Sequence, residues 1–118
     1  DVSPYFYISI IWYPCFENLF SILRKLNNNS SPLNPDNKHL HQLVFFFIKK
    51  RLKLSVIFSN NLSSAILIFF NFLIIYICSL NPSSTIYQVK LIICSALLYI
   101  SGYLILNKFY ELNFKFKK

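Results

Sequence analysis

Three stretches of this chain are long and apolar enough to cross a lipid bilayer. They cover residues 5–23, 62–80 and 86–106, and each is close to the roughly 20 residues that a membrane-spanning helix needs. Hydrophobic residues make up 55% of the 118-residue chain. A soluble domain of this size could not bury so many, because small domains leave much of their surface in water. The sequence therefore predicts an all-α, polytopic membrane protein with three transmembrane helices.

The charged residues lie mostly between these stretches and set the expected topology. Twelve Lys and Arg against four Asp and Glu give a net charge of +8. Because the bases flank apolar runs, they indicate membrane orientation and not a nucleic-acid partner. Residues 24–58 are rich in bases, whereas the turn at 81–85 has no charge. The positive-inside rule predicts one basic cytoplasmic loop at 24–58, a cytoplasmic C-terminus and an N-terminus on the outer side.

The first half of the basic loop favours turns. Residues 27–37 read NNNSSPLNPDN, and Pro32 and Pro35 bias their neighbours toward extended conformations. Asp36 or Asn37 could then cap a short helix that starts directly afterwards.

The second half of the loop is amphipathic. Residues 43–48 are apolar and residues 49–53 are basic, apart from one leucine. Such a segment is expected to lie at the membrane surface with its lysines near the lipid headgroups. Membrane lipid is therefore an expected partner of the chain.

Two features interrupt the first apolar stretch. Pro14 lies in its middle and lacks a backbone N–H, so the helix is expected to kink there. Glu17 is costly, because a carboxylate within a span costs about 2.5–3.5 kcal/mol on insertion scales. At about 100° per residue, Glu17, Ser21 and Arg24 share one helical face. This polar stripe either lines a cavity or orients the loop, or it forms an ordinary ion pair at a helix end.

The other chemistry-bearing residues have open interpretations. His39 and His41 point to one side if the segment is extended, and could hold a phosphate or a metal; alternatively they are ordinary solvated histidines. Cys78 and Cys94 either pair or stay free thiols. Asn71 is expected to hydrogen-bond to a neighbouring helix. The chain shows no nucleophile–base–acid set and no acidic cluster for Mg²⁺, so we assign no catalytic residue and no metal ligand within it.

An ordered series of residues links the first stretch to the loop. Residues 12–25 (WYPCFENLFSILRK) and 31–43 (SPLNPDNKHLHQL) resemble the C-terminal third of the polyprenyl-phosphate N-acetylhexosamine-1-phosphate transferases. This is glycosyltransferase family 4, with WecA-like and MraY-like branches. In that family a Pro-x-x-Asp/Glu pattern is followed by Arg residues, a Ser-Pro-x-x-Pro-Asp segment and a His-x-His-His motif. The chain departs from the series at Gln42, where the third histidine often stands.

The resemblance implies a role for each matching residue. Four side chains would bind the diphosphate of a nucleotide sugar or add positive potential near it: His39, His41, Arg24 and Lys38. Four others would shape the loop: Glu17, Asp36, Pro32 and Pro35.

The same resemblance implies an activity and a setting. The parent enzyme would be a phosphoglycosyl transferase of the bacterial inner membrane. It would move a sugar 1-phosphate from a UDP-N-acetylhexosamine to undecaprenyl phosphate, releasing UMP, in cell-envelope polysaccharide biosynthesis. Mg²⁺ would be its cofactor, with ligands in earlier loops that this chain lacks. Because the chain begins with Asp1 and has no Met, we expect a C-terminal fragment, inactive alone, whose partners include the missing N-terminal helices.

Two other classes stay open. The chain could be a non-catalytic three-span accessory protein, or a membrane protein whose basic loop binds anionic lipid. The sequence leaves a homodimer open in each case. An upstream reading frame with further spans and acidic loops would favour the transferase.

Overall fold

The computed structural model describes residues 1–36 and 38–115, and the regular structure in them is entirely α-helical. Four helices follow in sequence order: α1 (Pro4–Asn27), α2 (Leu40–Leu52), α3 (Val56–Ser79) and α4 (Thr85–Lys115). Helices α1, α3 and α4 are long and apolar enough to cross a membrane, which confirms the predicted fold class. The 24 residues of α3 form a rod of about 36 Å, longer than a hydrocarbon core of about 30 Å.

The helices extend beyond the apolar stretches that predicted them. Helix α3 starts several residues early, because the Ser55 hydroxyl caps it by accepting a backbone N–H of the first turn (3.3 Å). Helix α4 continues well past residue 106 to Lys115. Hydropathy marks only the part of a helix that lipid would surround. Helices α1 and α3 therefore both extend into the loop that was predicted over residues 24–58.

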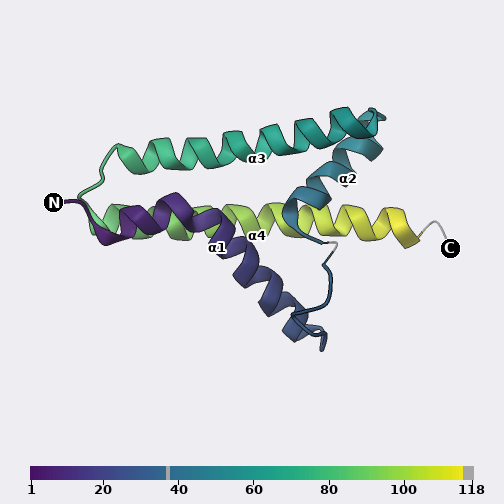
Figure 1. The fold of residues 1–118 in the computed structure, drawn as a ribbon, viewed down its shortest axis with the longest axis horizontal. Helices are drawn as coiled ribbons and strands as arrows, with labels where there is room; N and C mark the ends of the chain where they lie inside the picture. The colour runs from purple at the N-terminus through teal and green to yellow at the C-terminus, as the bar shows by residue number, and fades with distance from the viewer. Residues whose placement is uncertain (37, 116–118) are drawn as a thin grey trace.

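The two ends of the bundle differ in charge. Figure 1 places the N-terminus and the α3–α4 turn at one end, and the α1–α3 connection and the last turns of α4 at the other. At the first end the Ser3 backbone N–H donates to the Pro82 carbonyl (3.0 Å), and the Ser3 and Thr85 hydroxyls lie 3.0 Å apart.

The basic segments of the α1–α3 connection and of the last turns of α4 lie together at the other end (Figure 1), as the predicted topology requires. Lys117 and Lys118, which also contribute to that prediction, lie outside the described residues.

Helix α1 bends in its middle, where the sequence predicts a kink. Pro14 lies inside the helix and has no N–H to donate to the carbonyl four residues earlier. The first half of α1 runs beside α4, and its second half turns away from it (Figure 1). The bend therefore opens a wedge between the second half of α1 and α4.

Aromatic side chains fill the contact between α1 and α4. Phe16 meets the Tyr99 ring edge-on, with centroids 5.1 Å apart, and Phe20 meets Tyr103 in the same way at 4.8 Å. Both tyrosines belong to the buried core, together with Trp12. Edge-to-face pairs of this kind add about 0.5–1.5 kcal/mol beyond their burial. Many other large apolar side chains of the long helices are exposed, as expected for helices that lipid surrounds.

Gln88 fastens the end of the bundle opposite the basic loop. It is fully buried. Its side-chain amide donates to the carbonyls of Cys78 and Asn81 (both 2.9 Å) and accepts from the Ser9 hydroxyl (3.1 Å). Polar groups within a lipid-surrounded bundle have no water as an alternative partner. These bonds therefore hold α1 and α4 in register with the C-terminal end of α3.

The structure also decides the open points about Asn71 and the cysteines. The prediction that Asn71 bonds to a neighbouring helix is wrong, because its side-chain N–H donates to the Leu67 carbonyl of the same helix (2.8 Å). A backbone carbonyl one turn earlier satisfies the amide without any neighbour. Cys78 is buried, Cys94 is exposed, and both are free thiols.

Replacing Gln88 with leucine tests whether its hydrogen bonds stabilise the end of the bundle opposite the basic loop. Gln88→Leu removes the side-chain donor to the Cys78 and Asn81 carbonyls, whereas the Ser9 hydroxyl can still donate to the Tyr5 carbonyl (2.9 Å). We expect the free energy of unfolding to fall by about 1–3 kcal/mol. Thermal unfolding in detergent micelles, followed by circular dichroism, measures the change. Ser101→Ala is the matched control, because Ser101 is exposed and bonds within its own turn. Equal midpoints for the two variants would contradict the role of Gln88.

Candidate functional site

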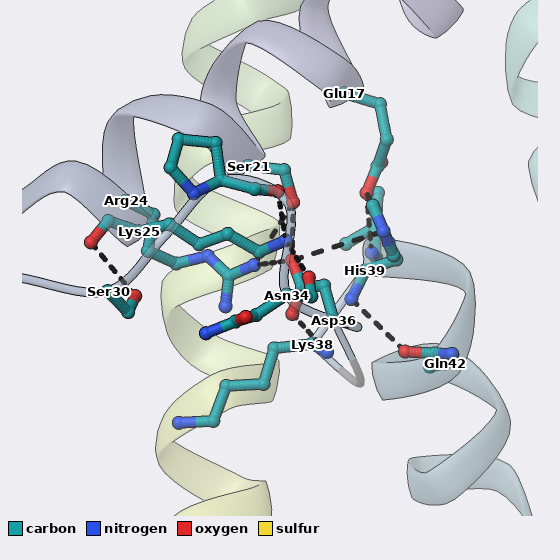
Figure 2. Close-up of polar contacts among 12 residues, drawn as sticks. Glu17, Ser21, Arg24, Lys25, Ser30, Asn34, Asp36, Lys38, His39 and Gln42 are labelled. Atoms are coloured by element: carbon teal, nitrogen blue, oxygen red, sulfur yellow. Dashed lines mark hydrogen bonds and ion pairs between the residues drawn. The ribbon is translucent and has the colours of Figure 1, made fainter. Parts of the chain in front are cut away.

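Five polar side chains gather where α1 meets the start of α2, and we call them the anchoring cluster. They come from one face of α1 and from the segment before α2 (Figure 2): Glu17, Ser21, Arg24, Asp36 and His39. The three members on α1 form the polar stripe that helical spacing predicts. Hydrogen bonds and an ion pair join Ser21, Arg24 and Asp36, and a second contact joins Glu17 and His39. The loop is therefore held against the helix at two points.

Glu17 holds the start of α2 in place. It is 9% exposed. One carboxylate oxygen accepts from the Leu40 backbone N–H (2.9 Å) and lies 3.0 Å from His39 Nδ1; the other accepts from the Tyr99 hydroxyl (2.7 Å). Leu40 is the first residue of α2, so Glu17 supplies an acceptor and a negative charge to a helix N-terminus. These contacts match the interpretation in which Glu17 orients the loop.

Asp36 binds the loop to the second half of α1. Its carboxylate pairs with the Arg24 guanidinium, accepts from the Ser21 hydroxyl (2.5 Å) and accepts from the Lys38 backbone N–H (2.9 Å). Burial alone would raise the pKa of the Asp36 carboxyl. The hydrogen bonds from Ser21 and Lys38 and the charge of Arg24 outweigh burial and hold that pKa below its ordinary value.

The prediction that Asp36 caps the following helix is wrong. Helix α2 begins at Leu40, so its N-cap is His39. The His39 backbone N–H donates to the side-chain oxygen of Gln42 (3.3 Å), as in one half of a capping box. Asp36 instead closes a turn of its own with the N–H two residues later. Asn37, the other candidate cap, lies outside the described residues.

Pro32 and Pro35 lie in the exposed part of the loop. The contact that fixes this part comes from Lys25, whose ammonium donates to the carbonyls of Pro32 (3.0 Å) and Asn34 (2.6 Å). Pro35 directly precedes Asp36 and restricts the backbone that enters the anchoring cluster. Nothing in the sequence distinguishes Lys25 from the other loop lysines, so its role was not predicted.

Three of the four predicted substrate-binding side chains pair with carboxylates. The pairs are Arg24 with Asp36, His39 with Glu17, and Lys38 with Glu111 (3.1 Å). These three acids are all the acidic side chains of the chain apart from Asp1. Three members of the cationic wall that the resemblance implies are therefore each held by a carboxylate. Of the four residues, only His41 has no acidic partner among residues 1–36 and 38–115.

Among the described residues, the predicted binding side chains are divided between two cavities and the anchoring cluster. Arg24 and Lys38 line a cavity of about 640 Å³ in the wedge between the second half of α1 and α4, which we call the wedge cavity. His41 is exposed and lines a separate cavity of about 340 Å³ between α2 and α3. His39 belongs to the anchoring cluster, and its ring stacks with that of His41 at 5.9 Å between centroids.

The described residues do not fit the Mg²⁺ that the resemblance implies. Within residues 1–36 and 38–115, no three side chains of His, Cys, Asp or Glu gather so as to hold a metal ion. The carboxylates of Glu17 and Asp36 already accept from N–H and O–H donors and contact cationic or imidazole groups. Mg²⁺ needs free oxygen ligands in octahedral geometry, and this donor set does not offer them.

Comparison with known proteins adds no family. No protein-family model, curated protein or solved structure matches this chain. The family resemblance therefore depends on the quoted residues alone, and the function has to be argued from the geometry.

Two further residues of this region were not predicted from the sequence. Tyr99 lies in an apolar stretch, and only the position of Glu17 on another helix makes its hydroxyl a hydrogen-bond donor to a carboxylate. Glu111 meets Lys38 across 73 residues of sequence. Pairs formed between distant segments leave no local spacing pattern by which to find them.

The pKa of Asp36 can be measured directly, because the chain has only two aspartates, Asp1 and Asp36. In an NMR titration with ¹³C-labelled aspartate, we expect the Asp36 carboxyl to titrate below the ordinary 3.8. Because the folded pKa is depressed, the loop contact contributes its full stability above the ordinary value. That stability is lost as the pH falls through the folded pKa.

Two variants check the cause of this shift. Arg24→Gln should move the Asp36 pKa upward, since it removes the neighbouring positive charge. Arg51→Gln removes an exposed charge near the end of α2 and should leave the pKa unchanged. A wild-type value at or above 3.8 would show that the network does not stabilise the carboxylate.

Proposed function

We propose that this chain is the C-terminal part of a phosphoglycosyl transferase that moves a sugar 1-phosphate from a UDP-N-acetylhexosamine to undecaprenyl phosphate. One observation supports the proposal above the others. Residues of the family-like series that are distant in sequence, such as Glu17 and His39 at 22 positions apart, meet in one hydrogen-bonded cluster. If the sequence match to the family were a coincidence, there would be no reason for the matching side chains to lie close together in the structure.

The anchoring cluster would serve this reaction by positioning. Phosphoryl transfer depends mainly on placing the reactants and on balancing charge at the transferring group. Glu17 fixes the first turn of α2, and that turn carries His41. The exposed imidazole of His41 can donate a hydrogen bond to a diphosphate oxygen. In this proposal His41 is therefore the direct contact to the nucleotide sugar.

His39 would both hold the loop against α1 and contact the substrate. Its Nδ1 lies against Glu17, and its Nε2 lies 3.9 Å from Asp36, beyond hydrogen-bond distance. A carboxylate that holds one ring nitrogen fixes the orientation of the imidazole and leaves the other nitrogen for a substrate. His39 would thus join the loop to the span and face the diphosphate with Nε2.

Arg24 and Lys38 keep a supporting place in the proposal. Each is paired with a carboxylate, so a substrate phosphate would have to share it with Asp36 or Glu111. The Mg²⁺ ligands would belong to another part of the enzyme, and no step assigned to this chain runs through the ion. The proposal also places the protein in the bacterial inner membrane with the basic end in the cytoplasm, following the positive-inside rule.

Substitution of His41 tests the proposed activity in the complete enzyme. His41→Ala removes a hydrogen bond to a charged oxygen, worth about 1.5–3 kcal/mol, so transfer should fall roughly 10- to 150-fold. The measurement is incorporation of labelled sugar phosphate from UDP-N-acetylglucosamine into undecaprenyl phosphate by membranes that lack other transferases. Arg51→Gln, on the exposed end of α2, is the control and should keep full activity.

Two results would overturn the proposal. One is the absence of any UDP-dependent transfer by the unmodified enzyme with undecaprenyl phosphate and a panel of UDP-N-acetylhexosamines. The other is a His41→Ala enzyme with the activity of the Arg51→Gln control.

Binding of anionic lipid by α2 is the second candidate function. The end of α2 carries four exposed bases, Lys49, Lys50, Arg51 and Lys53, whereas its apolar residues Leu40, Leu43 and Ile48 are buried. Bases near an anionic surface contribute about 1 kcal/mol each. This candidate is favoured if neutralising these bases reduces the anionic lipid recovered with the purified protein while no transfer activity is found.

A further inference from the structure

The Tyr99 hydroxyl on α4 lies at a fixed place in the core. It donates to Glu17 across the contact between α4 and α1 (2.7 Å), and Tyr99 is only 2% exposed. Its ring meets Phe16 and Phe20 edge-on, with centroids 5.1 and 5.4 Å apart, and stacks with Tyr103 at 6.4 Å. A side chain packed this closely has few alternative rotamers. The hydroxyl is therefore a rigid donor to the carboxylate.

Glu17 lies between this donor and the His39 ring. One carboxylate oxygen accepts from Tyr99, and the other accepts from the Leu40 backbone N–H (2.9 Å) and lies 3.0 Å from His39 Nδ1. A carboxylate oxygen can only accept, so the Nδ1 contact is a hydrogen bond only when Nδ1 carries a proton. In the neutral ring that proton leaves Nε2 unprotonated. The tautomer of His39 therefore depends on the position of the Glu17 oxygen.

The other neighbours of the His39 ring among the described residues do not fix its tautomer. Asp36 lies 3.9 Å from Nε2, beyond hydrogen-bond distance, and its carboxylate is paired with Arg24. The His41 ring stacks face to face with that of His39, at 5.9 Å between centroids, and this contact involves no N–H. Glu17 is therefore the group that selects the tautomer.

A second tyrosine near Glu17 cannot take the place of Tyr99. Tyr13 also lies close to the carboxylate and interacts with it, but the two residues are one turn apart on α1. A partner on the same helix moves together with Glu17. Only a donor on another helix gives the carboxylate a fixed position relative to α4, and Tyr99 is such a donor.

We propose that Tyr99 is a positioning residue that sets the orientation and the tautomer of His39 through Glu17. The hydroxyl holds one oxygen of Glu17, so that the other stays against Nδ1 and Nε2 is left for a ligand. The use of this arrangement in transfer rests on the proposed function. There Nε2 takes up a proton from water, and the imidazolium donates to Glu17 and to a diphosphate oxygen at once.

NMR of the chain labelled with ¹⁵N-histidine, in detergent micelles and without substrate, tests this role. The chain has two histidines, and His41→Ala identifies the signals of His39. Protonated and unprotonated ring nitrogens have separate ¹⁵N shifts, so the ratio of tautomers can be read at a pH at which both rings are neutral. We expect mainly the Nδ1–H form of His39 in the wild type. In Tyr99→Phe one oxygen of Glu17 loses its donor and the side chain can turn, so the ratio of the Nδ1–H to the Nε2–H form should fall roughly fivefold.

Tyr103→Phe is the matched control. Tyr103 lies one turn after Tyr99 on the same helix and is 3% exposed, and its hydroxyl has no hydrogen-bond partner among the described residues. This substitution removes the same atom from the same core without removing a donor to Glu17, so it should leave the ratio unchanged. In a Glu17→Ala background, Tyr99→Phe should have no further effect on His39, because the residue through which it acts is gone.

Three results would overturn the proposal. They are a wild-type ratio in Tyr99→Phe or in Glu17→Ala, an equal fall in Tyr103→Phe, and a further change when Tyr99→Phe is added to Glu17→Ala. A fall in Tyr99→Phe alone, absent from the Tyr103→Phe control and from the Glu17→Ala background, supports it.

The transfer assay separates this inference from the proposed function. In the complete enzyme, Tyr99→Phe should lower transfer roughly fivefold, in line with the tautomer ratio, and Tyr103→Phe should keep full activity. If the unmodified enzyme transfers no sugar phosphate, the proposed function fails, whereas the tautomer ratio of the chain without substrate still decides the role of Tyr99.

Discussion

A single carboxylate inside a membrane-spanning helix fixes the arrangement of the whole basic end. Glu17 lies ten residues before the end of α1, where an unpaired charge would be costly. Its two oxygens take donors from α2 and from α4 at once. The start of α2 therefore has one position that satisfies the carboxylate. The exposed imidazole of His41 depends on that position, because it lies in the first turn of α2.

Pairing with carboxylates gives Arg24, Lys38 and His39 a structural role that a count of the cationic residues does not suggest. In a chain with a net charge of +8, the internal acids meet side chains that look like a phosphate-binding set. Charges in a low-dielectric site need partners, so structural pairing and ligand binding call for the same residue types. Exposure then separates the two roles, since Arg24 is largely buried in its pair whereas Lys38 and Glu111 reach solvent.

The sequence predicted the structure correctly wherever a local pattern of residues determines it. Length and hydropathy predicted three spans, Pro14 predicted the bend, and helical spacing predicted the shared face of Glu17, Ser21 and Arg24. Prediction was weaker where two candidate partners compete. The Asn71 amide hydrogen-bonds to a carbonyl of its own helix. His39 is the N-cap of α2, whereas the Asp36 carboxylate is bonded to α1. Gln88 and Tyr99 escaped notice because their partners lie on other helices, a distance that no periodicity encodes.

The fastening of Ser3 to Pro82 and Thr85 has a mechanical consequence. The two ends of the bundle are tied differently: the Ser3 end by backbone, hydroxyl and amide bonds, and the basic end by contacts of the carboxylates of Glu17 and Glu111. When the contacts of the basic end are broken, the helices can turn as levers about the Ser3 end. For a helix of 31 residues such as α4, about 46 Å long at 1.5 Å per residue, a rotation of about 5° moves the far end by about 4 Å. Small changes in helix angle at the Ser3 end thus become large changes in the width of the wedge at the basic end.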